Sequence, residues 1–563
     1  MKRVMVHLVM VCVVLLLFGC FKPAPQNPPS PPPTQPPTQP PTQPPTQPPS
    51  QPPGEEPSQP TGYTIQGVVK KWNGEPLQGV TISAGGVSTT SDSQGRWSIS
   101  GLSGTVVVSA QLQNYYIVVN GTHYATSTQT SDAKQINFTA YDDVNDKFGG
   151  GTGTQDDPYI IVNVRQLNRV RDDLQAHYRQ IRDLDLNDLR LLEDNGSSDP
   201  TPNWYPIGLI ESSSYLGFLG SYDGSGFSIK NMIIYTGFFD GAGMFMHLSG
   251  ATLKNIVVEN SIIITNNECT HVGVIASRAV NSTIDNVHVY NSQFDFRRTS
   301  YFVGALIGWS SASTITDCSA VGINVKLAGR EYDVIRSAGG FVGVTHYSST
   351  FENCSVEATV TGTFWSVGGF AGSSYLSIFK NCDSKVKLKG KLMARACMGG
   401  FVGDVSSSVF QDCHVLFGSS IELLDSQSDN NYIGGFAGDV RDSDIATCTF
   451  DGQLIIEPVG GNGYVAGFVA YALAQSENRY LSSCTVHSGS SITLTATPTT
   501  TQYIGGLIGY GSGQSDSIKL IVSNNHVRIS LDAPESQNIQ SDPLIAQNNG
   551  NVELYENDAQ WEQ

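Results

Sequence analysis

The sequence predicts an all-β protein in which a parallel β-solenoid follows a small β-sandwich and a proline-rich linker. Short apolar phrases with paired glycines recur every 29 to 39 residues in the C-terminal half, the signature of stacked repeats. Glycine accounts for 58 of 563 residues and only 15% of residues are charged, a balance typical of turn-rich β proteins. Of the 28 prolines, 19 lie between Pro23 and Pro60, in a segment that cannot join a folded core.

Residues 1–19 have the pattern of a signal peptide. Lys2 and Arg3 precede an apolar run of 15 residues, shorter than the ~20 residues of a membrane span. The run ends in the phrase LFGC at residues 17–20, which resembles the bacterial lipobox, where a peptidase cuts before a lipid-modified cysteine. The resemblance implies a lipid on Cys20 and a membrane anchor, in the outer membrane if the cell has two. An ordinary signal peptide that contains a cysteine is the alternative.

Residues 20–60 are predicted to be a disordered tether. They repeat Pro-Pro-Thr-Gln, a composition that favours polyproline II and cannot bury a core. At ~3.1 Å per residue such a chain acts as a semi-rigid spacer, which would hold the rest of the protein away from a membrane. Docking of the prolines to a partner domain is the alternative.

Residues 61–141 are predicted to form a β-sandwich, because short alternating strands follow one another with polar turns between them. The phrase GVVKKWNGEPLQGVTISAGG, followed by TTSDSQGRWSISGLSG, resembles the carboxypeptidase regulatory-like domain, a transthyretin-like sandwich. The resemblance implies a spacing or supporting role and carries over no catalytic residue. Trp72 and Trp97 are candidates for stacking on a sugar, with core packing as the alternative.

Residues 236–535 carry the repeats, with a cap and first coils predicted for residues 142–235 and a C-terminal cap or tail for 536–563. Each repeat begins with a phrase such as VGGFAG or IGGFAG. The apolar fourth residue of the phrase occurs at Phe245, Ile275, Leu306, Phe341, Phe370, Phe401, Phe436, Phe468 and Leu507.

A second phrase, such as TFENCSV, follows each first one and supplies another short strand. Stacked in parallel, equivalent residues lie ~4.8 Å apart on successive coils. The centre of this phrase then forms an internal ladder that includes Cys318, Cys354, Cys382, Cys413, Cys448 and Cys484. The preceding column, which includes Asn255, Asn286, Asn353 and Asn381, is expected to hydrogen-bond from coil to coil at a turn.

The GGFVG and GGFAG phrases, each followed by N-C-x-V, resemble GLUG-motif repeats, which occur in bacterial surface proteins and in the N-terminal region of some IgA-specific metallopeptidases. The entry phrase FGGGTGTQDDPYII at residues 148–161 agrees with this resemblance, which extends to about residue 530. It implies a right-handed parallel β-helix. Residues 166–175 are predicted to be a short helix that covers the open end and so protects an exposed edge.

The ladder cysteines are interpreted as free, buried thiols, and no metal site or cofactor is expected. A straight column cannot provide the tetrahedral convergence that a structural metal ion needs. Disulfides between neighbouring coils are the alternative, although parallel side chains in register keep their Cβ atoms farther apart than a disulfide requires. HExxH, GxSxG and P-loop motifs are absent from the sequence.

The first functional hypothesis is a non-catalytic, lipid-anchored surface protein whose solenoid binds glycans or other envelope partners through many weak contacts. The alternatives are a carbohydrate-active β-helix enzyme, which needs acids that converge on adjacent coils, and a purely structural spacer. Asp285, Asp317 and Glu352 fall near one face but are interpreted as solvated turn residues. The net charge of −18 argues against binding to nucleic acid.

Overall fold

The structure of the protein, a computed structural model, describes residues 62–122, 125–129, 135–144, 147–187, 204–208, 217–235, 241–327, 333–424, 430–457 and 463–562. The predicted signal peptide with Cys20 and the predicted tether lie outside the described residues. None of the helices in the described ranges has the length and apolar character needed to cross a membrane.

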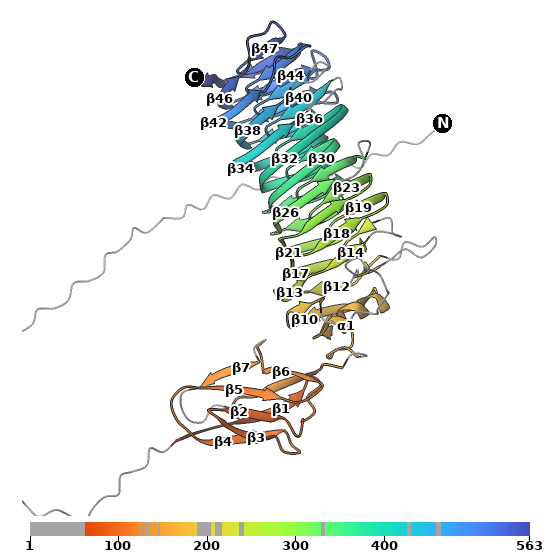
Figure 1. Ribbon diagram of the computed structural model, residues 1–563, viewed down its shortest axis with the longest axis vertical. Coiled ribbons are helices and arrows are strands. Elements are labelled where there is room, and N and C mark those ends of the chain that lie inside the picture. The colour runs from red at the N-terminus through yellow and green to blue at the C-terminus, as the bar shows by residue number, and fades with distance from the viewer. Residues whose placement is uncertain are drawn as a thin grey trace, which may run out of the picture. The chain divides into compact units, whose positions relative to one another are not determined.

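The N-terminal part of the described chain is a β-sandwich of two four-stranded sheets, ordered β4-β1-β8-β6 and β3-β2-β5-β7 (Figure 1). Its strands are β1 (Tyr63–Lys71), β2 (Thr81–Ala84), β3 (Val87–Thr90), β4 (Arg96–Leu102), β5 (Val106–Gln111), β6 (Tyr115–Val119), β7 (Thr126–Gln129) and β8 (Phe138–Asp142). The alternating pattern turns Ile65, Ile82, Val108 and Phe138 into one buried core between the sheets. Trp97 is also buried there, so packing and not sugar binding accounts for it.

The solenoid begins with a short cap. Strand β9 (Tyr159–Ile161) leads into α1 (Val164–Asn168) and a 3-10 turn, η1 (Arg169–Asp172). The side chain of Asn163 caps α1 by accepting a hydrogen bond from the Gln166 N–H at 2.9 Å. The helical segment is therefore shorter than the predicted 166–175, because Asp173 already has an extended backbone.

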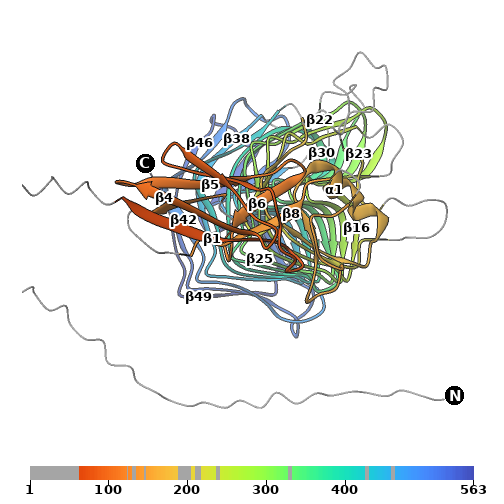
Figure 2. The same cartoon turned by 90° about the horizontal axis from the view of Figure 1, so that it is seen from below.

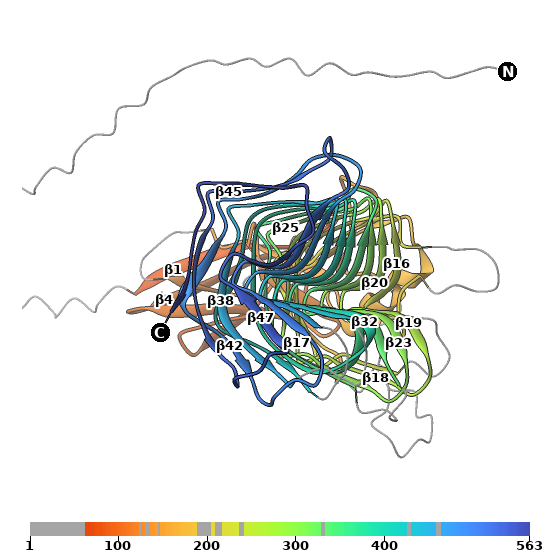
Figure 3. The same ribbon diagram turned by 90° about the horizontal axis from the view of Figure 1, so that it is seen from above.

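Successive coils pair in parallel, so the prediction of an all-β protein with a parallel β-solenoid is confirmed (Figures 2 and 3). One wall is a sheet of ten strands that pair only with their counterparts on neighbouring coils. These strands are β16 (Phe245–Ser249), β20 (Ala276–Val280), β24 (Ile307–Ser311), β28 (Val342–His346), β31 (Ala371–Tyr375), β33 (Val402–Ser406), β36 (Ala437–Arg441), β40 (Val469–Ala474), β44 (Ile508–Gly513) and β48 (Ile545–Asn548).

A second set of strands precedes this wall, joined to it by the glycine-rich bend of each repeat. It consists of β15 (Gly241–Ala242), β19 (Cys269–Val272), β23 (Ser300–Gly304), β27 (Ile335–Gly339), β30 (Ser355–Gly368), β32 (Ile378–Gly399), β35 (Asn431–Gly434), β39 (Gly463–Ala466), β43 (Gln502–Gly505) and β47 (Ile539–Asp542).

The remaining strands complete the coils. They are β10 (His177–Gln180), β11 (Leu184–Asp185), β12 (Ser221–Asp223), β13 (Ser228–Lys230), β14 (Ile233–Tyr235), β17 (Thr252–Glu259), β18 (Ile262–Thr265), β21 (Thr283–Tyr290), β22 (Gln293–Phe296), β25 (Thr314–Thr316), β26 (Ser319–Leu327), β29 (Thr350–Glu352), β34 (Val409–Leu423), β37 (Asp444–Ala446), β38 (Thr449–Ile456), β41 (Arg479–Ser482), β42 (Thr485–Leu494), β45 (Leu520–Ser523), β46 (His526–Asp532), β49 (Val552–Tyr555) and β50 (Asp558–Glu562).

The repeat phrase explains the sharp bend. A Cβ atom added to Gly403 would lie 2.3 Å from Ser366 Oγ and 2.7 Å from the carbonyl oxygen of Gly372, so the coils can approach only without a side chain there. The apolar residue of the phrase points into the solenoid, where Phe370, Phe401 and Phe436 stack with ring centroids 4.9 and 5.0 Å apart. A continuous aromatic column therefore fills the core beside the bend.

The predicted asparagine column lies at another corner of each coil. Asn255, Asn286, Asn353 and Asn381 have φ between 50° and 55°, a left-handed conformation that asparagine tolerates better than most residues. Their amides also connect coils: Asn286 Nδ2 donates to Asn255 Oδ1 at 2.9 Å, and Asn381 Nδ2 donates to Asn353 Oδ1 at 2.8 Å.

The structure places the six ladder cysteines next to this corner as buried, free thiols. Each thiol donates to the carbonyl oxygen two residues before it, over distances of 3.0 to 3.4 Å in Cys318, Cys354, Cys382, Cys413, Cys448 and Cys484. The residue just before each cysteine has a left-handed backbone, which turns the preceding carbonyl group toward the interior. The small cysteine side chain fits there, and its weak S–H donor satisfies the carbonyl oxygen.

Candidate functional site

Two columns of outward-pointing side chains flank the glycine-rich bend and face each other along the solenoid. From His271 onward, each repeat has one such residue before the bend and one after it, seven positions apart. The bend brings the two residues of one repeat together, as in Tyr464 and Tyr471, whose ring centroids are 5.8 Å apart. It also brings the first residue of one coil to the second residue of the next: the ring centroids of His271 and Trp309 are 6.2 Å apart, and Ser337 Oγ lies 3.0 Å from Ser373 Oγ. These facing residues are here called the bend columns.

The composition of the bend columns changes along the solenoid. The column before the bend runs through His271, Phe302, Ser337, Ser366, Cys397, Tyr432, Tyr464 and Tyr503. The column after it runs through Arg278, Trp309, Val344, Ser373, Asp404, Asp439, Tyr471 and Tyr510. Serines fill the middle coils, whereas acidic residues and then tyrosines occupy the later ones.

The tyrosines line a pocket of about 390 Å³, here called the tyrosine pocket. Its lining residues are Arg395, Asn430, Tyr432, Arg441, Tyr464, Tyr471 and Tyr510. Strands β35, β39, β40 and β44 provide the four rings, so the pocket extends over several successive coils. The pocket therefore presents similar aromatic side chains on neighbouring coils.

The tyrosine rings are packed against one another. Tyr471 and Tyr510 stack at 4.6 Å, and Tyr464 and Tyr503 stack at 5.2 Å. Across the bend, Tyr432 lies 4.8 Å from Tyr471. Stacking between coils covers much of the ring faces, so ring edges and phenol hydroxyls remain for a ligand. Burial raises the pKa of Tyr471 to about 12 and also raises those of Tyr432 and Tyr464, which keeps these phenols neutral donors at pH 7.

An acidic cluster adjoins the tyrosines, on the coil of Tyr432 and on the coil before it. Asp404 on β33 and Asp439 on β36 are register partners, and their carboxylate oxygens and the Cys397 Sγ lie within 4.8 Å of one another. Arg441 Nη2 contacts Asp439 Oδ2 at 2.5 Å, while Arg441 Nε lies 3.2 Å from Oδ1. This ion pair neutralises the buried carboxylate of Asp439.

The environment disfavours charge on the second carboxylate. Burial raises the pKa of Asp404 to about 6, with a further contribution from the charge of Asp439 and an opposing one from Arg441. Burial also raises the pKa of Asp439, against the effect of Arg441. Burial likewise raises the pKa of the Cys397 thiol, which therefore stays protonated at pH 7.

This cluster offers three ligand atoms to a metal ion, but a cation already occupies one side of it. A divalent ion at Asp404 and Asp439 would have to displace the Arg441 guanidinium. As a carboxylate pair from adjacent coils, Asp404 and Asp439 resemble the closely spaced acids of retaining glycosidases, whose carboxyl groups are ~5–5.5 Å apart. Asp439 is only 2% exposed, which limits its access to a substrate.

The acids considered from the sequence lie elsewhere on the coils. Asp285 Oδ1 accepts a hydrogen bond from Thr316 Oγ1 at 2.6 Å, and Asp317 Oδ1 accepts one from Asn353 Nδ2 at 3.0 Å. These residues serve the corner that contains the asparagine column and are not brought into the tyrosine pocket. The residues that do converge were not identified from the sequence, although their spacing of seven across the bend phrases from residue 271 onward is visible there.

These observations define a class of protein, a parallel β-solenoid of glycine-bend repeats with an aromatic and acidic strip on its outer surface. Residues 336–361 match the family model of the GLUG motif, and the repeats of the same pattern agree with that match. The chain is also 27% identical over 178 residues to Halomucin from Haloquadratum walsbyi, an alignment that covers 31% of this chain and 2% of Halomucin. The chain thus spans a small fraction of this relative.

Comparisons with solved structures give weak likenesses. A candidate immunoglobulin A1 protease from Bacteroides ovatus is 20% identical, with 49% of this chain and 80% of that chain covered and a TM-score of 0.37. A structure of IgA1 Protease is 13% identical over 74% of this chain and 29% of that chain, with a TM-score of 0.34. The catalytic domain of a GH87 alpha-1,3-glucanase in complex with nigerose is 12% identical over 87% and 89% of the two chains, with a TM-score of 0.22. Likenesses of this size carry no argument about activity.

Proposed function

We propose that this protein is a lipid-anchored, cell-surface protein whose solenoid binds a neutral polysaccharide in the tyrosine pocket. The observation that carries the proposal is the pocket itself, in which four tyrosines from successive coils face solvent beside two arginines. Tyrosines provide a rigid apolar edge together with a hydroxyl that donates and accepts hydrogen bonds, a combination suited to sugars.

The charges around the pocket support a neutral ligand. Asp439 follows Tyr432 on the same coil and is neutralised by Arg441, whereas the carboxylate of Asp404 on the coil before would oppose binding of a carboxylated or sulfated polymer. Arg441, which could otherwise attract an anion, is paired with Asp439. Contacts with single sugar units are weak, so affinity would come from several coils that engage one chain together.

The proposed location is the bacterial cell envelope, with Cys20 carrying a lipid and residues 20–60 acting as the tether. Its support is the lipobox-like phrase at residues 17–20 and the proline-rich repeat that follows. Residues 61–141 would be a carboxypeptidase regulatory-like spacer between the tether and the solenoid. The net charge of −18 supports glycan or protein partners over nucleic acid.

The test is binding of the purified full chain to an array of neutral polysaccharides, followed by titration of each retained polymer. We expect Tyr471→Ala to weaken binding by about tenfold, equal to ~1.4 kcal/mol, because it opens the centre of the pocket. Tyr471→Phe separates the role of the hydroxyl from that of the ring. Tyr480→Ala is the matched control, since Tyr480 is 47% exposed and outside the pocket. Equal binding by all variants would refute the proposal.

A second candidate function is hydrolysis of the bound polysaccharide, which is favoured by the proximity of Asp404 and Asp439 to the tyrosines. The same array wells can be assayed for released reducing sugar. Product formation that is lost in Asp404→Asn would establish an enzyme. Retention without product would favour the binding protein, and neither retention nor product would favour a structural spacer.

A further inference from the structure

Strand β32 presents a row of lysines on the outer surface of an acidic protein. Lys385, Lys387, Lys389 and Lys391 occupy alternate positions of this strand, and all four are exposed. Because side chains alternate across a strand, the four ammonium groups share the solvent face. This local concentration of positive charge contrasts with the net charge of −18.

The neighbouring coils neutralise two of these lysines. Lys385 Nζ lies 3.1 Å from Glu357 Oε1 on β30, and Lys389 Nζ lies 2.7 Å from Glu422 Oε1 on β34. Lys387, between them, has no ion pair within the part of the chain that the structure describes. The local net charge at Lys387 is therefore positive.

The residues beside Lys387 on adjacent coils are polar and uncharged. Register pairing places Thr359 of β30 on one side of Lys387 and Ser420 of β34 on the other. Asn324 of β26 is the next residue in the same row, beyond Thr359. Lys387 is thus a single ammonium group within a row of hydrogen-bonding side chains.

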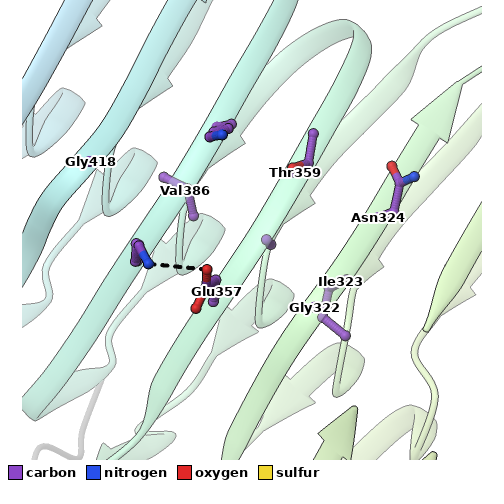
Figure 4. Close-up of a pocket in the computed structure, with 10 residues that line it drawn as sticks. Gly322, Ile323, Asn324, Glu357, Thr359, Val386 and Gly418 are labelled. Atoms are coloured by element: carbon purple, nitrogen blue, oxygen red, sulfur yellow. Dashed lines mark hydrogen bonds and ion pairs between the residues drawn. The ribbon is translucent and has the colours of Figure 1, made fainter. Parts of the chain in front are cut away.

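The surface is hollowed at this point, and the cause is the register of the strands (Figure 4). Pairing between β26 and β30 shifts at Gly322, and pairing between β32 and β34 shifts between Ser384 and Lys387. The four strands pair in the order β26, β30, β32 and β34, and the two outer strands carry extra residues that bulge out of the sheet on either side of the inner pair. The result is a depression of about 340 Å³, here called the lysine pocket.

The lining of the lysine pocket combines charge with polarity. It includes Asn324, Thr359, Lys385 and Lys387, with Gly322 and Gly418 at the two bulges. Figure 4 shows Glu357 and Thr359 on β30 and Asn324 on the neighbouring strand β26. Phe417, next to the lining residue Gly418 on the β34 bulge, is 79% exposed, the largest exposed fraction among the large apolar side chains of the described residues.

We infer that the lysine pocket binds an acidic sugar residue of an anionic polysaccharide, with the sugar carboxylate at Lys387, its hydroxyls at Thr359 and Asn324, and its ring against Phe417. This site is separate from the tyrosine pocket, whose four tyrosines lie on other strands and whose lining contains no lysine. The two pockets together would let one solenoid hold two classes of polysaccharide.

The chemistry of the site favours a carboxylate over phosphate. The lining supplies one unpaired ammonium group and no arginine, whereas the planar fork of arginine is the usual partner in bidentate phosphate recognition. Because Lys385 and Lys389 are already paired with glutamates, the positive charge of Lys387 can balance one negative charge on a ligand. A polymer in which a carboxylated sugar alternates with a neutral one matches this spacing of charge better than a uniformly charged one.

The experiment measures binding of the purified full chain to hyaluronan, polygalacturonate, dextran sulfate and neutral dextran. We expect hyaluronan to bind, and to bind more weakly as salt rises from 0.1 M to 1 M, because the screening length falls from ~10 Å to ~3 Å. Lys387→Met removes the charge and keeps most of the stem. It should weaken hyaluronan binding by about tenfold, whereas Lys387→Arg should retain most of it.

The matched control is Lys70→Met, which removes an exposed lysine of β1 from the sandwich. Unchanged hyaluronan binding in Lys387→Met, or an equal loss in Lys70→Met, would overturn the inference, as would preferential binding of dextran sulfate or the absence of any binding to carboxylated polymers. Failure of this site would leave Tyr471→Ala effects on neutral polymers unchanged, so the two proposals fail separately. Thermal unfolding of each variant checks that the solenoid is intact.

Discussion

Replacing Phe401 by alanine tests whether the internal aromatic column stabilises the solenoid. The Phe401 side chain has no exposed surface and stacks between Phe370 and Phe436, with centroid distances of 4.9 and 5.0 Å. The rings of Phe379 and Phe410 approach it edge-on, each at 5.9 Å. Removing the ring would leave a cavity in contact with two neighbouring coils.

The magnitude follows from these contacts. Truncation of a buried phenylalanine to alanine costs ~3–5 kcal/mol, and each aromatic pair contributes ~0.5–1.5 kcal/mol beyond its buried area. With four ring neighbours lost, we expect a decrease of about 5 kcal/mol in the free energy of unfolding. Because coil stability in a solenoid depends on nearest neighbours, the loss should also promote local unfolding around β33.

The assay is urea unfolding followed by circular dichroism and tryptophan fluorescence, with agreement between the two probes as the check on two-state behaviour. Phe417→Ala is the matched control, since the same substitution at a residue that is 79% exposed should change stability by less than ~0.5 kcal/mol. Equal midpoints for the Phe401 and Phe417 variants would refute the reasoning about the aromatic column.

Three further predictions concern the corner, the acidic cluster and the thiols. Asn353 has a φ of 55°, which alanine adopts less readily than glycine, so the free energy of unfolding of Asn353→Ala should be ~1 kcal/mol lower than that of Asn353→Gly in urea titrations. Burial raises the pKa of Asp404 to about 6 in the folded state, from ~3.9 in the unfolded state, so the folded state binds more protons between these two values. The free energy of unfolding should therefore fall as the pH rises from 4 to 6. Urea titrations at each pH should show a smaller fall in Asp404→Asn. Burial raises the pKa values of Cys354, Cys413 and Cys484, so peptide mass spectrometry should find them alkylated only after unfolding.

Much of the architecture could be predicted from the sequence because residues that stack on successive coils recur at a regular spacing along the chain. The spacing of the bend phrases defines the coil, and the alternation of apolar and polar residues assigns Phe401 to the interior. The same logic placed Asn353 in a turn and Cys354 beside it, where the structure has them. The cap helix was predicted too long because its apolar pattern continues beyond Asp173, where tertiary contacts extend the backbone.

The candidate sites depended on the tertiary structure. Asp404 and Asp439 are far apart in sequence, and only the register between β33 and β36 makes them neighbours. Tyr471 meets Tyr432 of the previous coil because the glycine bend folds one strand toward the next, a direction that periodicity alone does not specify.

The sequence by itself determined the repeat, the β-class and the division into inward and outward positions, because these follow from local periodicity. The tertiary structure decided which outward residues converge and where the surface is hollowed. The lysine pocket shows the reason: Lys387 lies in a depression because β26 and β34 carry extra residues and their neighbours do not, and such shifts of register arise only when strands pair.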